Sequence, residues 1–374
     1  MKKVLIVGAG FSGATVARIL AERNFDVTVV DKRDHIAGNA FDETINGIHV
    51  HKYGAHIFHT PNKRVWDFVN RFAEFNTYKH HVRAIHKGKN YSMPISLDTI
   101  CQFLGEDISP YGAREWVKQH SSEITGVPQN LEEKAISLIG RPLYEAFIKE
   151  YTWKQWKTDP KDLPASIITR LPVRYDFNTR YFNDLYEGMP IGGYAELVRK
   201  MLAHDNIRVL LKVQIGSRQD FNEYDGVYYC GPVDHFFDYR FGKLKWRSVD
   251  FLFEKHHDVD DINGCAVTNF SDSDREHTRV IEFKHFYPEE RNVQTGTIVA
   301  FEKSKDPESA DDFYYPVNTE LDRLMMDDYA ALSQETLIKD RVLLGGRLGR
   351  YKYFDMHQAI AIAFNDADTL QGVI

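Results

Sequence analysis

The chain has 374 residues, of which 43% are hydrophobic and 27% are charged. This composition is typical of a globular protein, and the length predicts two or three domains. The net charge of −7 argues against nucleic acid as a general partner. The sequence also lacks the run of about 18 apolar residues that membrane insertion requires.

The three cysteines are Cys101, Cys230 and Cys265, and none of them forms a C-x-x-C pair. Their spacing argues against a disulfide framework or a zinc site and is typical of a reducing compartment. Glycines interrupt the short apolar run that follows Lys2-Lys3, so we expect a first strand there and no signal peptide. We therefore expect a cytoplasmic protein.

The first 31 residues carry the pattern of a dinucleotide-binding unit. An apolar run over 4–7 predicts a buried strand, 8–13 reads G-x-G-x-x-G, and 14–23 predicts a helix. A second strand is expected over 26–30, ending at Asp31. In this context the glycine fingerprint predicts dinucleotide binding, with an empty glycine turn as the alternative.

Each glycine of the fingerprint has its own task. Gly8 permits the tight turn, Gly10 lets the backbone approach a pyrophosphate, and Gly13 lets helix and strand pack closely. The helix N-terminus offers N–H groups to the phosphates, and Asp31 is expected to bind a ribose. We expect cofactor contacts from the whole loop, which also contains Phe11 and Ser12.

The next residues favour FAD over NAD. Lys32 begins a basic pair, and a turn containing Gly38 and Asn39 precedes a short strand expected near 48–50. This arrangement resembles the second glycine motif of the glutathione-reductase-like and amine-oxidase-like flavoproteins, which runs beside the FAD pyrophosphate. Ala37 stands where a second glycine is usual, so the turn is atypical.

Later stretches complete the predicted FAD domain. We expect strands over 208–213, with Val213 as a candidate for adenine contact, and over 227–230. A last strand over 342–344 is followed by a turn with Gly346 and Arg347. A helix that opens at Asp355-Met356 is expected to point its N-terminus at the flavin and stabilise the reduced anion. The alternative is an ordinary C-terminal helix.

We therefore predict an α/β fold with a Rossmann-like FAD-binding domain, a helical insertion and an antiparallel β-sheet domain. Helix patterns dominate 96–166, and β-rich segments fill 245–301. The expected boundaries are 1–76, 188–243 and 334–374 for the FAD-binding domain, 96–166 for the helical domain, and 77–95, 167–187 and 244–333 for the sheet domain, which binds substrate.

Four histidines fall within eleven positions: His49, His51, His56 and His59. Metal binding is one interpretation, but no cysteine or carboxylate of suitable spacing joins them, so we predict no metal. A histidine on a strand is more often a hydrogen-bonded structural residue. A histidine after a glycine turn can also tune a flavin or relay a proton.

Several longer segments resemble the bacterial UDP-galactopyranose mutases, in order and over nearly the whole chain. They are 52–60 (KYGAHIFHT), 151–156 (YTWKQW), 171–174 (LPVR), 278–282 (TRVIE), 284–286 (KHF), 314–317 (YYPV), 345–348 (GGRL) and 351–356 (YKYFDM).

The resemblance implies a flavin-dependent isomerase that converts UDP-galactopyranose to UDP-galactofuranose without net redox change. Reduced FAD attacks the sugar through N5, and a covalent N5–C1 adduct forms. An electron donor for FAD, a homodimer and a role in cell-surface polysaccharide synthesis are implied by the family alone.

The resemblance also implies the site residues. Arg170 and Arg279 would bind the diphosphate, since arginines are permanently charged and bidentate, although the nearby Arg174 competes for the role of Arg170. His59 would lie beside the flavin ring and act with these arginines in catalysis, and His56 and Ile57 would support the cofactor. The remaining substrate contacts would come from Phe147, Tyr151, Trp156, Tyr181, Tyr315 and Tyr353.

Two departures leave the sugar open. Trp153 stands where the family usually has a charged residue such as Glu, and Lys157-Thr158 replaces a common Gly-Arg. UDP-N-acetylgalactosamine and dTDP-fucopyranose remain alternative substrates. The competing functions are a flavin amine oxidase or desaturase, an NAD-dependent dehydrogenase, and a flavin-binding protein without activity.

Overall fold

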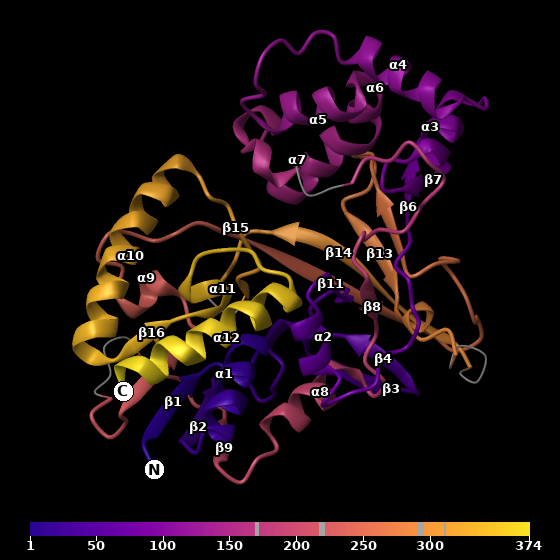
Figure 1. Ribbon diagram of the computed structural model, residues 1–374. Coiled ribbons are helices and arrows are strands. Elements are labelled where there is room, and N and C mark those ends of the chain that lie inside the picture. The colour runs from indigo at the N-terminus through magenta and orange to yellow at the C-terminus, as the bar shows by residue number, and fades with distance from the viewer. Residues whose placement is uncertain (169–171, 217–220, 290–294, 310–311) are drawn as a thin grey trace.

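The computed structural model describes residues 1–168, 172–216, 221–289, 295–309 and 312–374. Two sheets and a helical segment organise these residues (Figure 1). The two chain ends lie near each other beside the smaller of the two sheets (Figure 1).

The first sheet is five-stranded and parallel, with the order β16-β10-β1-β2-β9. Its strands are β1 (Lys3–Val7), β2 (Asp26–Asp31), β9 (Ile207–Leu211), β10 (Gly226–Tyr229) and β16 (Val342–Leu344). The Rossmann-like sheet is thus assembled from chain segments more than 300 residues apart. Its central strand β1 is a continuous apolar run because both faces of a parallel sheet are covered.

Helices α1 (Phe11–Glu22) and α12 (Met356–Val373) pack against each other over this sheet (Figure 1). Helix α8 (Gly193–Leu202) also contacts α1. Small residues make this close packing possible, since Ala14, Ala17 and Ala363 are all fully buried. Helices α1 and α12 both begin at the large cavity described below.

The second sheet is seven-stranded, with the order β15-β11-β14-β13-β12-β6-β7. Its strands are β6 (Val82–His86), β7 (Lys89–Met93), β11 (Trp246–His256), β12 (Val267–Phe270), β13 (Arg279–Glu282), β14 (Thr297–Lys305) and β15 (Tyr315–Pro316). We predicted an antiparallel sheet, and all pairs are antiparallel except β6–β12, which is parallel. A parallel pair needs a long crossover, which the chain between these strands supplies.

The helical segment lies beyond β6 and β7 (Figure 1). It contains α3 (Leu97–Leu104), α4 (Pro110–His120), α5 (Leu131–Ile139), α6 (Arg141–Tyr144), a π-helical turn η2 (Glu145–Lys149) and α7 (Glu150–Trp156). Ser96 and Asn130 begin α3 and α5 by accepting hydrogen bonds from backbone N–H groups of the first turn. The exact domain boundaries remain a prediction.

The remaining described elements connect these parts. They are the short strands β3 (Asp42–Ile45), β4 (Ile48–His51), β5 (Phe58–Thr60) and β8 (Tyr186–Gly188), the α-helices α2 (Lys63–Val69), α9 (Val233–Phe236), α10 (Glu320–Asp340) and α11 (Gly346–Gly349), and the 3₁₀ turns η1 (Gly38–Ala40), η3 (Pro160–Asp162), η4 (Ala165–Ile167) and η5 (Phe283–Phe286). No helix among the described residues combines the length and the apolar surface that crossing a membrane requires.

Candidate active site

A cavity of about 660 Å³ is lined by residues of both sheets and of the helical segment. This volume is typical of small-molecule sites. Most of the predicted site residues line it, namely Gly8, Gly10, Phe11, Ser12, Gly13, Asp31, Gly38, Asn39, His56, Ile57, His59, Phe147, Tyr151, Tyr181, Arg279, Tyr315, Gly346, Arg347, Tyr353, Asp355 and Met356.

Three predicted residues do not line this cavity. Lys32 and Val213 line a second cavity of about 160 Å³, which shares Gly8, Asp31 and Cys230 with the large one. Trp156 lines neither cavity, although its ring lies 6.3 Å from that of Tyr315. Arg170 falls outside the described residues.

The glycine loop forms a cradle at the end of β1. Gly8 has a φ of 109°, and its N–H donates to the Val30 carbonyl at 2.7 Å. A Cβ on Gly13 would lie 1.9 Å from the Gly8 carbonyl oxygen, so only glycine allows this contact between helix and turn. Among the described residues, no side chain caps the N-terminus of α1. Its N–H groups are therefore available to an anion in the cavity.

The second turn is tied directly to the first. The Ala37 N–H donates to the Ala9 carbonyl at 2.9 Å, and Ala37 adopts the left-handed conformation with a φ of 70°. The Asp31 carboxylate accepts from the Ala9 N–H at 2.7 Å and from the Arg33 N–H at 3.0 Å. Ala37 thus takes the backbone conformation of the glycine it replaces, and the two turns form one unit.

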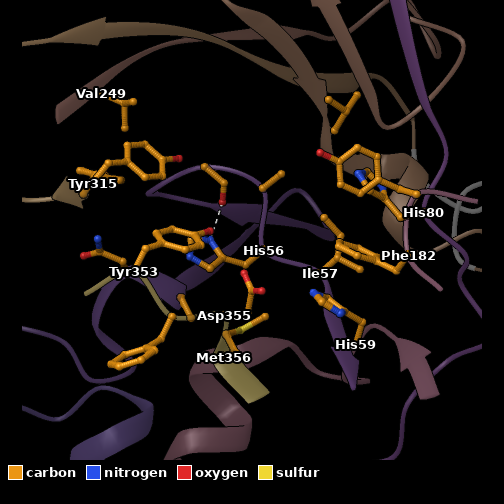
Figure 2. A pocket seen from close by; sticks show the side chains of 18 of the residues that line it. His56, Ile57, His59, His80, Phe182, Val249, Tyr315, Tyr353, Asp355 and Met356 are labelled. Carbon is orange, nitrogen blue, oxygen red and sulfur yellow. Dashed lines mark hydrogen bonds between the residues drawn. The ribbon is translucent and has the colours of Figure 1, made fainter. Parts of the chain in front are cut away.

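His56 lies on the same side of the cavity as Asp355 and Met356 at the start of α12 (Figure 2), and Arg347 lines the same cavity. The His56 Nδ1 is 2.7 Å from the Gly54 carbonyl, so this nitrogen carries the proton and donates. Burial lowers the pKa of His56 to about 4, partly offset by this bond, and the charges of Arg347 and Arg279 lower it further. His56 is therefore neutral at physiological pH.

His59 belongs to a second cluster in the same cavity. Its Nδ1 lies 2.6 Å from the Asp184 carboxylate, and its ring stacks on Phe182 at 3.6 Å between centroids. Phe182 lies between His59 and His80, as Figure 2 shows. The His357 ring approaches His59 edge-on at 4.9 Å. The carboxylate fixes the orientation of the His59 imidazole, as a positioned proton relay requires.

Candidate metal ligands cluster at two places among the described residues. His59, Asp355 and His357 have ligand atoms within 4.8 Å of one another, and so do Asp261, Glu282 and His285. His59 already engages Asp184, and the Glu282 carboxylate accepts from the Thr297 hydroxyl at 2.6 Å. The absence of a metal stays a prediction.

Arg279 begins β13 and lines the cavity. Its guanidinium forms an ion pair with Glu302 of β14 at 2.7 Å, and Glu302 is only 1% exposed. Burial alone would lower the pKa of Arg279, but the Glu302 carboxylate raises it above its usual range, with contributions from Tyr151 and Tyr315. A fixed cation thus lies in the wall of the cavity.

Aromatic hydroxyls accompany this cation. The Tyr315 and Tyr353 rings stack at 5.5 Å between centroids, and the Arg347 guanidinium lies 6.0 Å from the centre of Tyr353. Tyr151 and Tyr181 line the same cavity from the helical segment and from the loop after it. Tyrosine hydroxyls can donate to phosphate oxygens without adding charge.

The structure separates Arg174 from the cavity. Arg174 is 8% exposed, and its guanidinium donates to the carbonyls of Asn178 and Arg180 and to the Asn183 side chain. It therefore fastens the loop that carries Tyr181. Trp153 is 49% exposed, and the Lys157 ammonium lies over its ring. Trp153 does not line the cavity, so the structure gives it no contact with a ligand there.

Several lining residues were missed from the sequence: His80, Phe182, Asp184, Asn269 and Glu302. Burial lowers the pKa of His80 to about 3, with further lowering by Arg279, and its Nδ1 is 2.9 Å from the Tyr78 hydroxyl. Glu302 lies in β14, whose second half alternates between buried and partly exposed residues. A charged residue at a buried position of this strand was the available signal for a functional residue.

Comparisons with known proteins identify the family. A model described as "UDP-galactopyranose mutase" matches residues 146–353, and one for a Rossmann-like NAD(P)-binding domain matches 6–72. A probable UDP-galactopyranose mutase of Klebsiella pneumoniae is 40% identical over 98% of this chain and 94% of that protein. A dTDP-fucopyranose mutase of Escherichia coli is also 40% identical, over 98% of both chains.

Solved structures agree on the fold. A crystal structure of reduced UDP-galactopyranose mutase has a TM-score of 0.75 at 14% identity and covers all of this chain and 96% of its own. A putative protoporphyrinogen oxidase from Exiguobacterium has a TM-score of 0.65 at 12% identity, covering 99% of this chain and 98% of its own. At these identities the likeness concerns the fold. The full-length sequence relatives and the family model decide the assignment: the chain is an isomerase of the UDP-galactopyranose mutase family.

Proposed function

We propose that this protein is an FAD-dependent, non-redox isomerase that converts UDP-galactopyranose to UDP-galactofuranose. The observation that carries the proposal is that one cavity is lined both by the glycine cradle and by the Arg279–Glu302 ion pair with its tyrosines. A cofactor and a nucleoside diphosphate sugar each find matching chemistry there. The oxidase alternative lacks a use for a half-buried arginine among tyrosine hydroxyls.

The residues present fit FAD. The uncapped N-terminus of α1 suits the pyrophosphate, and Asp31 borders both cavities, where a ribose would lie. The small cavity, lined by Val213 and Lys32, suits the adenine. The start of α12 at Asp355 would meet the flavin ring and favour its anionic reduced form. When bound and reduced, the flavin would supply the nucleophile for the anomeric carbon of the sugar.

The protein's own part is to bind and stabilise the leaving diphosphate. Negative charge grows on the diphosphate as the bond between the anomeric carbon and oxygen breaks, and a preorganised buried cation stabilises that charge. Arg279 has this property, and Tyr315 and Tyr353 offer hydroxyls beside it. Arg170 is proposed as the second arginine from its sequence motif. Tyr151 and Phe147 are proposed to hold the pyrimidine.

His56 and His59 are proposed to act on the cofactor side. Neutral His56 donates to the Gly54 carbonyl and so presents an unprotonated Nε2. His59 is held by Asp184 and is proposed to pack beside the flavin ring. Arg347 is proposed to lie near the flavin edge, since it lines the cavity next to the start of α12.

Other parts of the proposal follow from the family. We propose that an electron donor keeps FAD reduced, that the protein is a cytoplasmic homodimer, and that its product serves cell-surface polysaccharide synthesis. The second candidate substrate is dTDP-fucopyranose, favoured by the equal identity to the dTDP-fucopyranose mutase. UDP-N-acetylgalactosamine is a third candidate for the same chemistry.

Parallel assays of the reduced protein test the choice of sugar. The furanose or pyranose forms of UDP-galactose, dTDP-fucose and UDP-N-acetylgalactosamine are offered separately, and kcat/KM is compared by chromatography of the nucleotide sugars. We expect the highest kcat/KM with UDP-galactofuranose. A tenfold preference for a dTDP-linked sugar would overturn the choice of sugar and leave the reaction type standing.

A further inference from the structure

A buried lysine outside the cavity joins the helical segment to the seven-stranded sheet. Lys154 of α7 is 3% exposed, and its ammonium contacts four main-chain carbonyl oxygens. The distances are 2.6 Å to Phe270, 2.6 Å to Asp272, 3.1 Å to His277 and 3.3 Å to Arg275. All four carbonyls belong to the segment 270–277, which runs from the last residue of β12 toward β13. We call this arrangement the Lys154 cage.

The cage stabilises a buried charge, because an ammonium has three N–H donors and its burial is costly without hydrogen-bond partners. Carbonyl dipoles from four residues converge on one cation. A neutral side chain of the same length would leave all of these oxygens without their shared donor. The segment is therefore folded around the lysine, and its shape depends on that ammonium.

Neighbouring contacts strengthen the same junction. The Glu150 carboxylate, one turn earlier on α7, accepts from the Ser273 N–H at 2.5 Å. The Asp272 carboxylate contacts His86 Nδ1 at 2.5 Å and accepts from the Lys87 N–H at 2.6 Å. The segment is thus held between α7 and the turn that joins β6 and β7.

Both sides of the junction carry ligand-facing residues. Tyr151 lies three residues before Lys154 on α7, and Arg279 follows the caged segment by two residues. Asn269 and Ser271, which flank the caged Phe270 carbonyl, also line the cavity. A shift of α7 relative to this segment would therefore change the distance between the proposed pyrimidine-binding tyrosine and the proposed diphosphate-binding arginine.

We propose that Lys154 is a positioning residue that sets the spacing between Tyr151 and Arg279 for a pyrimidine nucleoside diphosphate. The inference rests on the proposed function, because that function assigns the two ligand contacts. Lys154 itself does not line the cavity. Its effect is expected on nucleotide affinity and KM, with the cofactor side left intact.

The test compares three variants of the FAD-bound protein. Lys154→Met removes the ammonium at similar volume, Lys154→Arg keeps a cation with several donors, and Lys149→Met is a control on the exposed face of the same helical stretch. The affinity for UDP is measured by calorimetry, together with kcat and KM.

We expect Lys154→Met to raise the Kd for UDP and the KM at least tenfold, with kcat lowered less than threefold and FAD content unchanged. Lys154→Arg should recover part of the affinity, and Lys149→Met should match the wild type. Wild-type affinity for UDP in Lys154→Met would overturn the proposal, and so would an equal fall in kcat and FAD content without a change in Kd.

Two further measurements keep the test decisive. If Lys154→Met does not fold, Glu150→Ala removes the contact to Ser273 and a negative charge that favours the Lys154 ammonium. This variant should raise the Kd about threefold, and an unchanged Kd overturns the proposal. If the wild type binds UDP but converts no sugar, the proposed reaction fails and the affinity test still decides on Lys154. If it binds neither UDP nor dTDP, the proposed function and the positioning role fail together.

Discussion

Arg279 and Glu302 face each other across the pair of strands β13 and β14, in direct register, with the guanidinium 2.7 Å from the carboxylate. Glu302 is almost fully buried, and Arg279 is open to the cavity on its other side. One strand pair therefore supplies both a cation for a ligand and the carboxylate that holds it. This pairing explains how an arginine can be kept charged and oriented in a largely enclosed site.

The first prediction concerns Arg279 itself. Arg279→Ala should lower kcat/KM by at least about 100-fold, because a preorganised cation at the leaving group is lost, while FAD stays bound. The kcat/KM of Arg279→Lys should lie between those of the wild type and Arg279→Ala, because lysine keeps the charge and loses the bidentate geometry. Steady-state kinetics and the flavin absorbance of each variant measure the effects. Wild-type turnover in Arg279→Ala would remove Arg279 from the proposed diphosphate site.

A pair of glycine variants separates cofactor binding from folding. At Gly10 an added Cβ would meet only the Gly38 Cα at 3.8 Å and the Gly38 N at 4.0 Å, which are ordinary contacts, whereas at Gly13 it would clash with the Gly8 carbonyl. Gly10→Ala should therefore fold normally but bind FAD at least tenfold more weakly, because the backbone can no longer approach the pyrophosphate. Gly13→Ala should lose stability as well. Thermal unfolding of the apoprotein measures the loss of stability, and FAD titration measures the loss of cofactor binding. Wild-type FAD affinity in Gly10→Ala would contradict the proposal that the glycine cradle binds the pyrophosphate.

The contact between His59 and Asp184 predicts that the two residues act as a unit. His59→Ala should shift the flavin spectrum or its reduction potential, and Asp184→Asn should produce a change in the same direction because it releases the imidazole. The double variant should show little more than His59→Ala alone. Spectra and potentials that stay unchanged in all three variants would place the flavin ring away from His59.

A pH prediction follows from His80. Burial lowers its pKa from 6.5 to about 3, so the native state resists protonation that the unfolded chain accepts. This contribution to stability is fully present above pH 6.5 and is lost as the pH falls toward 3. At pH 5 the loss in the free energy of unfolding amounts to about 2 kcal/mol. His80→Gln should therefore flatten the fall in the free energy of unfolding between pH 7 and pH 5. Urea unfolding at the two pH values measures it, and an equal fall in both proteins would contradict the assignment.

Local sequence was enough to predict the geometry of the glycine turn at the end of β1. The tasks of Gly8 and Gly13 depend on neighbours within one strand–turn–helix unit, and both appear as predicted. The start of α12 was likewise marked by Asp355, whose N–H donates to Gln358. Such contacts span few residues, so their geometry follows from the local chain.

Other parts of the site depend on contacts between distant segments. Asp184 reaches His59 across 125 positions, and Lys154 reaches the 270–277 segment across more than 110. No local pattern marks such partners, since a lone carboxylate or lysine in a sequence is most often on the surface. The sequence also left Arg174 as a rival of Arg170, and only its bonds to the 178–183 loop show that Arg174 holds the structure together.

The central claim is that this chain isomerises a nucleotide sugar only when its flavin is reduced and without consuming electrons. The most direct measurement is chromatography of UDP-galactofuranose incubated with the purified yellow protein, with and without dithionite. The account predicts many turnovers to UDP-galactopyranose per flavin in the reduced sample and almost none in the oxidised one. Equal conversion in both samples, or product limited to one equivalent per reduced flavin, would contradict it.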